Sequence, residues 1–518
     1  MRNRSLLPIL VLALLACLPL AAQPPGQPPA GKPEPEKEKV EEKDRKMPEE
    51  KISTTRHTIT LDGQRIPYTA TAGNLVLKDD EGKPKASVFS IAYTRDGIKD
   101  PAQRPVTFAF NGGPGSASVL VHLGAFGPRR VERTKEGMGL PPPGRLVDND
   151  HSILDLTDLV FIDPVSTGYS RPAPGEDRKQ FHGVRQDIEW VAEFIRLWIT
   201  RNERWASPKF IAGESYGTTR SAGLAQHLND RYGMALNGIV LISSVLNFQN
   251  HQFDVGNDMA YVLHLPTYAA TAWYHKKLPP ELSGDLRKTL DEVEAFALGE
   301  YASALMQGDR LGPERRREIA ARVARYTGLS QDYVERTNLR VEIFRFIKEL
   351  LRDQRKTVGR LDSRFTGSDL DAAGEYSEFD PSAASLDGPY TTAINDYLRR
   401  ELGVKEDRVY ERRGRVWPWS FEGYENRYVN LAENLRQAMT RNPDLKVLFT
   451  AGYYDLATPY FDSVYTADHL GLPESLRGNV SIRYYEAGHM MYIREADHAK
   501  FKKDIADFLR EAVRQGER

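Results

Sequence analysis

The 518-residue chain has little cysteine and no charge excess. Cys17 is the single cysteine, so the chain cannot form an intramolecular disulfide. The 71 Lys and Arg residues nearly balance the 72 Asp and Glu residues, which leaves a formal net charge of −1. A chain without a basic excess gives no indication of nucleic-acid binding, and none is expected. The apolar run at residues 6–15 is too short to span a bilayer comfortably.

That run is nevertheless typical of an export signal, because Arg2 and Arg4 precede it. Cleavage after Ala22 would follow small residues and would make residues 1–22 a signal peptide. Alternatively, residues 14–17, Leu-Leu-Ala-Cys, resemble a bacterial lipobox with Cys17 as the lipidated residue. Both interpretations predict an exported protein that is periplasmic, outer-membrane-anchored or secreted. Membrane contact is expected only through such an N-terminal lipid anchor.

Residues 23–53 are rich in proline and then in charge, and they offer little apolar surface to bury. This composition predicts a disordered tether. Ordered structure is expected to begin near Thr54.

The rest of the chain alternates short apolar segments with helical patterns, which favours a mostly parallel sheet covered by helices. The sheet is predicted from two stretches, residues 54–249 and 425–518. Between them, residues 250–424 become charged and mainly helical, which indicates a cap inserted into the core. The predicted class is therefore an α/β-hydrolase fold with an inserted helical cap. The strands that carry this prediction are 105–110, 158–163, 210–212, 239–242, 445–450 and 480–485.

The most informative segment is Gly213-Glu214-Ser215-Tyr216-Gly217, between an apolar strand and a helical pattern. A strand, a sharp G-x-S-x-G turn and a helix form the context of a nucleophile elbow, in which the serine hydroxyl is held in front of the sheet. The N–H of Tyr216, at the start of the helix, would point toward an oxyanion.

Three further segments follow predicted strands. The glycine cluster at residues 111–116 lies where an α/β-hydrolase places its second oxyanion donor. Asp455 and His489 each follow a later strand, and the order Ser215, Asp455, His489 is the α/β-hydrolase order. Other acids and histidines are expected to be solvated or peripheral residues of helices: Asp462, Asp468, His469 and His498.

Taken together, these motifs resemble those of the serine carboxypeptidases, the family of carboxypeptidase Y and cathepsin A. The resemblance is carried by 111–115 (Asn-Gly-Gly-Pro-Gly), 213–217, 452–455 (Gly-Tyr-Tyr-Asp) and 488–490 (Gly-His-Met). It implies removal of residues from peptide C-termini through an acyl-enzyme, with peptides as partners and neither cofactor nor metal. It assigns Ser215 as nucleophile, His489 as base and Asp455 as the group that orients the base. It also assigns the N–H groups of Gly113 and Tyr216 to the oxyanion hole, and Asn111, Gly112 and Glu214 to the substrate's terminal carboxylate.

A substrate carboxylate beside Glu214 would raise the pKa of the pair, so binding should favour acidic pH. Three departures from the family bear on this implication. Ala125 stands where familiar members carry a glutamate joined to the same carboxyl network, which weakens the case for an acid optimum. Ala109 replaces a tryptophan, and the family's disulfides are absent, so packing alone must hold the cap.

Other functions fit the same motifs. An esterase, an aminopeptidase or an acyltransferase could use the same scaffold, and a tethered binding protein without catalysis is a different class again. An intact Ser, Asp and His argue against the last of these. The sequence predicts neither the preferred side chains nor the oligomeric state.

Overall fold

The computed structural model describes residues 48–514. The predicted signal peptide, most of the predicted tether and the candidate lipidation site at Cys17 lie outside this range. The first strand already begins at Ile52, close to the predicted start of order. Within residues 48–514, none of the helices has the length and apolar character needed to cross a membrane.

The core is a ten-stranded sheet in which the strands follow the order β1-β2-β3-β7-β4-β9-β10-β13-β14, with β8 paired to β3. The first three strands pair antiparallel, and those from β7 to β14 run parallel. Parallel strands covered by helices on both faces form the predicted α/β-hydrolase fold. The strand bounds are β1 Ile52–Leu61, β2 Gln64–Lys78, β3 Pro84–Arg95, β4 Val106–Phe110, β7 Asp158–Ile162, β8 Arg171–Pro172, β9 Lys209–Glu214, β10 Gly238–Ile242, β13 Lys446–Gly452 and β14 Val480–Tyr485.

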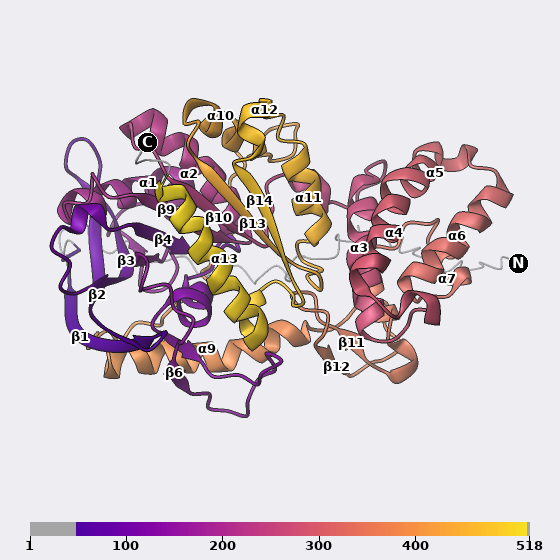
Figure 1. Ribbon diagram of the computed structural model, residues 1–518, viewed down its shortest axis with the longest axis horizontal. Helices are drawn as coiled ribbons and strands as arrows, with labels where there is room; N and C mark the ends of the chain where they lie inside the picture. Colours follow the sequence, from indigo (N-terminus) through magenta and orange to yellow (C-terminus); the bar gives the residue numbers. More distant parts are fainter. Residues whose placement is uncertain (1–47, 515–518) are drawn as a thin grey trace, which may run out of the picture. The chain divides into compact units, whose positions relative to one another are not determined.

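Two apolar clusters lie on opposite faces of this sheet because its central strands are buried on both sides. One cluster includes side chains of α1 (Val184–Arg201), α2 (Tyr216–Tyr232), α10 (Ala432–Arg441) and α12 (Glu474–Arg477). The other includes side chains of α9 (Pro381–Arg400) and α13 (Glu495–Arg514). Figure 1 shows α13 crossing in front of the sheet and α9 running below it. Because β7, β4, β9, β10, β13 and β14 run parallel, their carboxyl ends lie at one edge of the sheet.

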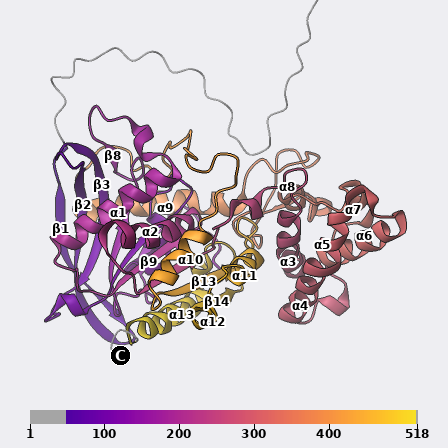
Figure 2. The ribbon, with the colours of Figure 1, turned by 90° about the horizontal axis from the view of Figure 1, so that it is seen from above.

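A third apolar cluster belongs to the cap and also contains residues that follow β13. The cap helices gather beside the sheet in both views (Figures 1 and 2). Apolar packing thus joins the cap to the core, as the lack of disulfides requires. The helices are α3 Met259–Tyr274, α4 Leu286–Phe296, α5 Ala302–Gln307, α6 Pro313–Thr327, α7 Gln331–Arg336 and α8 Ile343–Glu349, and α11 Tyr460–Asp468 packs against α3.

The sequence predicts a cap that comprises all of residues 250–424. The second half of this range packs differently from the prediction. Helix α9 packs into the apolar cluster of β1 to β3, not into that of the cap. Isolated bridges then join residues 411–430 to the core, for example Gly168 to Glu411 and Asn247 to Asn430. Apolar residues of α9 such as Tyr397 explain this path, because they complete a core that the cap does not reach. Two separate two-stranded sheets complete the fold. One pairs β5 (Arg129–Val131) with β6 (Leu146–Asp148), and the other pairs β11 (Thr357–Val358) with β12 (Thr366–Gly367). In the large sheet, the short strand β8 pairs with β3.

Candidate active site

Ser215 lies at the tight turn between β9 and α2, with φ 60° and ψ −130°. This is an unfavourable backbone conformation for a non-glycine residue, and such strain concentrates at functional sites. The turn needs its glycines because strand and helix cross closely. A Cβ on Gly213 would lie 2.2 Å from the carbonyl oxygen of Gly217. The Ser215 N–H donates to the carbonyl of Ile242 at 2.9 Å, which fixes the turn to the neighbouring strand β10.

Asp455 and His489, which follow β13 and β14, come together in the structure. His489 Nδ1 lies 2.7 Å from Asp455 Oδ2. The carboxylate is fully buried, and it also accepts the N–H groups of Ala457 and Thr458 and the Thr458 hydroxyl at 2.6–3.0 Å. An ionised carboxylate can only accept hydrogen bonds, so His489 Nδ1 carries the proton that it shares with Asp455. Nε2 is then the basic nitrogen of the ring.

The electrostatic surroundings of His489 favour its protonation. Burial by itself lowers the pKa of His489, but the charge and hydrogen bond of Asp455 and the charge of Glu214 raise it above the ordinary value. A raised pKa makes the imidazole a stronger base toward the proton of a nucleophile.

No hydrogen bond joins Ser215 Oγ to His489 within residues 48–514. The two loops are connected through β10 instead: the Ser243 hydroxyl donates to the carbonyl of His489 at 2.7 Å, next to the Ile242 carbonyl that holds Ser215. Catalytic hydrogen bonds often tighten only when substrate binds, so the missing bond does not exclude Ser215 and His489 as nucleophile and base.

The glycine cluster after β4 lies against the elbow. A Cβ on Gly112 would lie 2.4 Å from the Tyr216 nitrogen, so only a glycine fits here. The next residue, Gly113, has φ +108°, which also favours glycine. In the described part of the chain, the N–H groups of Gly113 and Tyr216 have no hydrogen-bond partner. Two unpaired donors from touching segments, one at a helix N-terminus, can stabilise a developing oxyanion.

Asn111 and Glu214, the two predicted carboxylate-binding side chains, contact each other. Asn111 Nδ2 donates to Glu214 Oε1 at 2.7 Å, and both residues are 2% exposed. Arg220 in α2 holds the Asn111 carbonyl at 2.8 Å while its Nε pairs with Asp187 at 2.7 Å. Asn111 is therefore fixed from both its side chain and its main chain.

Tyr492 completes this cluster and was not predicted. Its hydroxyl donates to Glu214 Oε2 at 2.5 Å. The Tyr492 ring lies against the π-helical turn Val121–Phe126: a Cβ on Gly124 would lie 2.5 Å from the ring. The next residue in that turn is Ala125, where the resemblance implied a glutamate, and Tyr492 beside it donates a hydrogen bond to Glu214. A tyrosine three residues after the candidate histidine was the available sequence signal.

Burial raises the pKa of Glu214 to about 7, although the charge of His489 and the hydrogen bonds from Tyr492 and Asn111 lower it. Glu214 and His489 influence each other, so their protons belong to a coupled pair. At neutral pH the protonated and ionised forms of Glu214 are both populated. A group of this kind can donate a hydrogen bond to an anion only while it keeps its proton.

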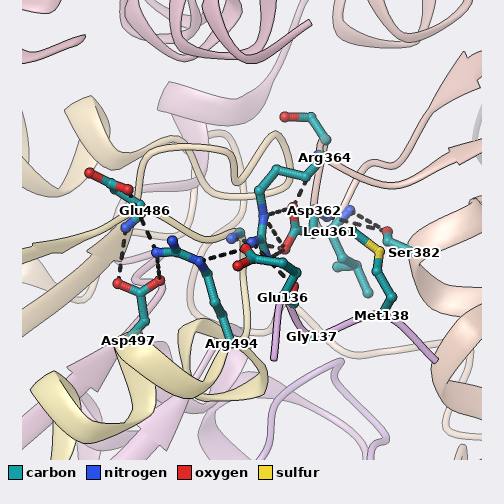
Figure 3. Close-up of polar contacts among 12 residues, drawn as sticks. Glu136, Gly137, Met138, Leu361, Asp362, Arg364, Ser382, Glu486, Arg494 and Asp497 are labelled. Carbon is teal, nitrogen blue, oxygen red and sulfur yellow. Dashed lines mark hydrogen bonds and ion pairs between the residues drawn. The ribbon is translucent and has the colours of Figure 1, made fainter. Parts of the chain in front are cut away.

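A segment that returns from the cap supports the histidine loop. The N–H of His489 donates to the Leu361 carbonyl at 2.7 Å, and that of Gly488 donates to Asp362 Oδ2 at 3.1 Å. Asp362 in turn forms a buried ion pair with Arg364, with Nη2 and Oδ2 2.6 Å apart. Figure 3 shows Arg494 linked to Glu136 and Asp497 beside this pair. The cap segment thus fixes the backbone that carries His489.

The other acids and histidines of the sequence divide into exposed and buried groups. Asp468 and His469 are exposed, as predicted. The expectation for Asp462 is wrong: it is fully buried and bonds Asn250 and, at 2.9 Å, His251. His498 is also buried, and its Nε2 lies 2.9 Å from the Ala125 carbonyl. Helical periodicity missed both because their partners come from distant segments. No group of three potential metal ligands occurs within residues 48–514.

Comparison with known proteins identifies the family of the chain. The sequence model of the serine carboxypeptidase family matches residues 81–495. Similar curated proteins include serine carboxypeptidase-like 33 of Arabidopsis thaliana, 28% identical over 168 residues, which are 31% of each chain. Another is carboxypeptidase Y homolog A of Chaetomium globosum, 29% identical over 140 residues, or 27% of this chain and 22% of the relative. The chain thus spans about a third or less of the length of these two relatives.

Among solved structures, a prohormone-processing carboxypeptidase from Saccharomyces cerevisiae superposes with a TM-score of 0.51 and 14% identity. The match covers 85% of this chain and 91% of the yeast chain. At this identity the likeness shows the shared fold.

Proposed function

The chain belongs to the serine carboxypeptidase family, and on this premise we propose that it is a serine-type carboxypeptidase that releases C-terminal residues from peptides. The observation that carries the proposal is the Asn111–Glu214–Tyr492 cluster, which adjoins the candidate nucleophile through the Glu214–Ser215 bond. A triad alone would serve any serine hydrolase, whereas a buried amide and a protonatable carboxyl beside it suit a free terminal carboxylate.

In the proposed reaction, Ser215 Oγ attacks the carbonyl carbon of the last peptide bond while its proton passes to His489 Nε2. The oxyanion receives the N–H groups of Gly113 and Tyr216. As the C–N bond breaks, His489 gives the proton to the leaving amine and an acyl-enzyme remains. His489 then takes a proton from water, whose oxygen attacks the acyl carbon, and returns it to Ser215. Asp455 holds the imidazole and balances its charge.

The terminal carboxylate would be bound by Asn111, the Gly112 backbone and Glu214. Glu214 must be protonated to donate, and its two oxygens already accept from Asn111 and Tyr492. If Glu214 carries its proton on Oε2, it donates to the Tyr492 oxygen, which becomes the acceptor. The Tyr492 hydroxyl can then rotate and donate its own proton to another group. Tyr492 could then donate to the substrate in place of Glu214 itself.

The test compares peptides that differ only in their C-terminus. Asn111→Ala and Glu214→Gln should lower kcat/KM for a free C-terminus by about one to two orders of magnitude, since hydrogen bonds to a charged group contribute about 1.5–3 kcal/mol. The matched amide and a simple ester should change much less. Equal losses on all three substrates would leave a general serine hydrolase, such as an esterase, aminopeptidase or acyltransferase.

For location, the run at residues 6–15 supports an exported enzyme, with Cys17 as the candidate anchor. If Cys17 is acylated, the protein should fractionate with membranes and Cys17→Ser should release it. One acyl chain binds a membrane only marginally, so several are needed. Intact-mass analysis that finds a chain beginning at Gln23 would exclude the anchor.

A further inference from the structure

Arg360 carries a charge without a partner. It follows β11 and is half-buried, and its main chain is held on both sides. Its N–H donates to Asp380 Oδ1 at 3.1 Å and its carbonyl accepts from Leu456 N–H at 3.1 Å. The guanidinium itself makes neither a hydrogen bond nor an ion pair with any residue from 48 to 514. The five donors of a guanidinium suit a carboxylate, which can accept two of them at once.

The main-chain contacts of Arg360 place it between the two catalytic loops. Leu456 directly follows Asp455, and the residue after Arg360, Leu361, accepts the N–H of His489 at 2.7 Å. Three residues after Arg360, the Ser363 hydroxyl lies 2.7 Å from the Thr271 hydroxyl of α3, and the Ser363 carbonyl lies 2.7 Å from His275 Nε2 at the end of that helix. The charge of Arg360 also opposes the rise in the pKa of His489. Arg360 therefore belongs to the segment that joins the loop of His489 to the base of the cap.

Arg360 is bonded to the loop of Asp455, which in sheet order lies on the opposite side of Ser215 from Asn111. In the parallel part of the sheet the order is β4, β9, β10, β13. Asn111 follows β4, Ser215 follows β9, and Asp455 follows β13. A peptide whose C-terminal residue lies on the Asn111 side of Ser215 has its preceding residue on the Asp455 side. That preceding residue supplies the scissile carbonyl and would lie on the flank to whose loop Arg360 is bonded.

We propose that Arg360 binds an acidic side chain, Asp or Glu, on the residue that supplies the scissile carbonyl. The enzyme would then prefer peptides with an acidic penultimate residue. A carboxylate would complete the hydrogen bonds of a guanidinium that the protein leaves open, in surroundings where partial burial strengthens the pair. The inference rests on the proposed carboxypeptidase function, since it takes the direction of the bound peptide from the Asn111–Glu214–Tyr492 cluster.

The experiment uses three N-acylated dipeptides with a C-terminal leucine and Glu, Gln or Lys as the penultimate residue. Glu and Gln have nearly the same shape, so their ratio of kcat/KM reports the charge. The wild-type enzyme should favour Glu over Gln by about tenfold, as expected for one charge-assisted contact. Arg360→Gln should bring this ratio close to one, and Arg360→Glu should favour Lys over Glu.

Arg355→Gln is the matched control, because this exposed arginine lies five residues earlier in the same segment. It should leave the Glu-to-Gln ratio unchanged. An unchanged ratio in Arg360→Gln, or equal losses on all three dipeptides, would overturn the proposal. A loss confined to free C-termini, whatever the penultimate residue, would also overturn it and assign Arg360 to the terminal carboxylate.

The same dipeptides separate this inference from the proposed function. Their C-terminal amides report whether a free carboxylate is needed, independently of the penultimate residue. If amides and acids react alike, the carboxypeptidase proposal fails even when the Glu-to-Gln ratio depends on Arg360. If free acids are strongly preferred but the ratio does not depend on Arg360, only the inference about Arg360 fails.

Discussion

The two flanks of Ser215 differ in how their polar groups are satisfied. On the β4 side, both oxygens of Glu214 accept hydrogen bonds, from Asn111 and Tyr492, and the carboxyl is buried. On the β13 side, Arg360 is half-buried and its guanidinium has no partner among residues 48–514. The polar groups of the first flank are all hydrogen-bonded, and the proton on Glu214 determines whether that flank can donate to an anion. The second flank presents a positively charged guanidinium without a partner within the described residues.

The residues that perform the proposed reaction are thus distinct from those proposed to recognise the substrate. The elbow, the Asp455–His489 pair and the two unpaired N–H groups suit acyl transfer in general. What makes the proposed enzyme a carboxypeptidase lies on the first flank, and what selects among peptides is proposed to lie on the second. Substitutions on either flank should therefore change which substrate reacts, while those in the triad should affect every substrate.

The largest expected effect removes the chemistry that both flanks share. Ser215→Ala or His489→Ala should lower kcat by about three orders of magnitude or more on acids, amides and esters alike, because triad members act as a unit. Asp455→Asn should cost somewhat less. Steady-state kinetics on folded variants, checked by circular dichroism, measure this. Near-wild-type turnover of Ser215→Ala would contradict the assignment of the nucleophile.

Sequence alone could predict these residues because each follows a strand of a parallel sheet. The carboxyl ends of such strands meet at one edge, so Ser215, Asp455 and Asn111 are brought together by topology. Tyr492, Arg220 and Arg364 do not follow strands in this way. Their roles depend on contacts between segments that are far apart in the chain, and the sequence offered only one hint, the position of Tyr492 three residues after His489.

The second prediction weakens the segment that carries Arg360. Arg364→Ala leaves Asp362 buried without its partner, which should lower the free energy of unfolding by about 3–5 kcal/mol. Asp362→Asn combined with Arg364→Met should recover part of this loss, since an asparagine oxygen can still accept the Gly488 N–H. Urea denaturation measures the effect.

The matched control for that experiment is Arg336→Ala, which removes an exposed ion pair with Asp332. Exposed pairs contribute about 1 kcal/mol or less, so this variant should remain close to wild type. If Arg364→Ala were no less stable than Arg336→Ala, the buried pair would not support the histidine loop.

The third prediction tests the role of Tyr492 on the first flank. Tyr492→Phe removes a hydrogen bond to the ionised carboxylate and should raise the pKa of Glu214 further above about 7. Protonated Glu214 would then persist to higher pH, so the decline in kcat/KM for free C-termini should move to higher pH. At neutral pH the rate should fall by about tenfold if the phenol also donates to the substrate. Esters serve as the internal control and should show neither change.

Burial was the hardest property to predict from local pattern. Asp462 and His498 lie on helices whose spacing suggested solvated positions, yet both are buried and bonded to distant segments. Likewise α9 reads as part of the cap in sequence order, but its apolar face completes the core of β1 to β3. Periodicity identifies an apolar face but not the surface that covers it.

The most direct test of the carboxypeptidase proposal needs only the wild-type enzyme and two substrates. The dependence of kcat/KM on pH is measured for one peptide with a free C-terminus and for its C-terminal amide. For both, the rate should rise as His489 loses its proton, at a pH above the ordinary histidine value. For the free peptide alone, it should fall again as Glu214 ionises near its pKa of about 7, which gives a bell-shaped profile. Identical profiles and similar rates for the two substrates would contradict the proposal.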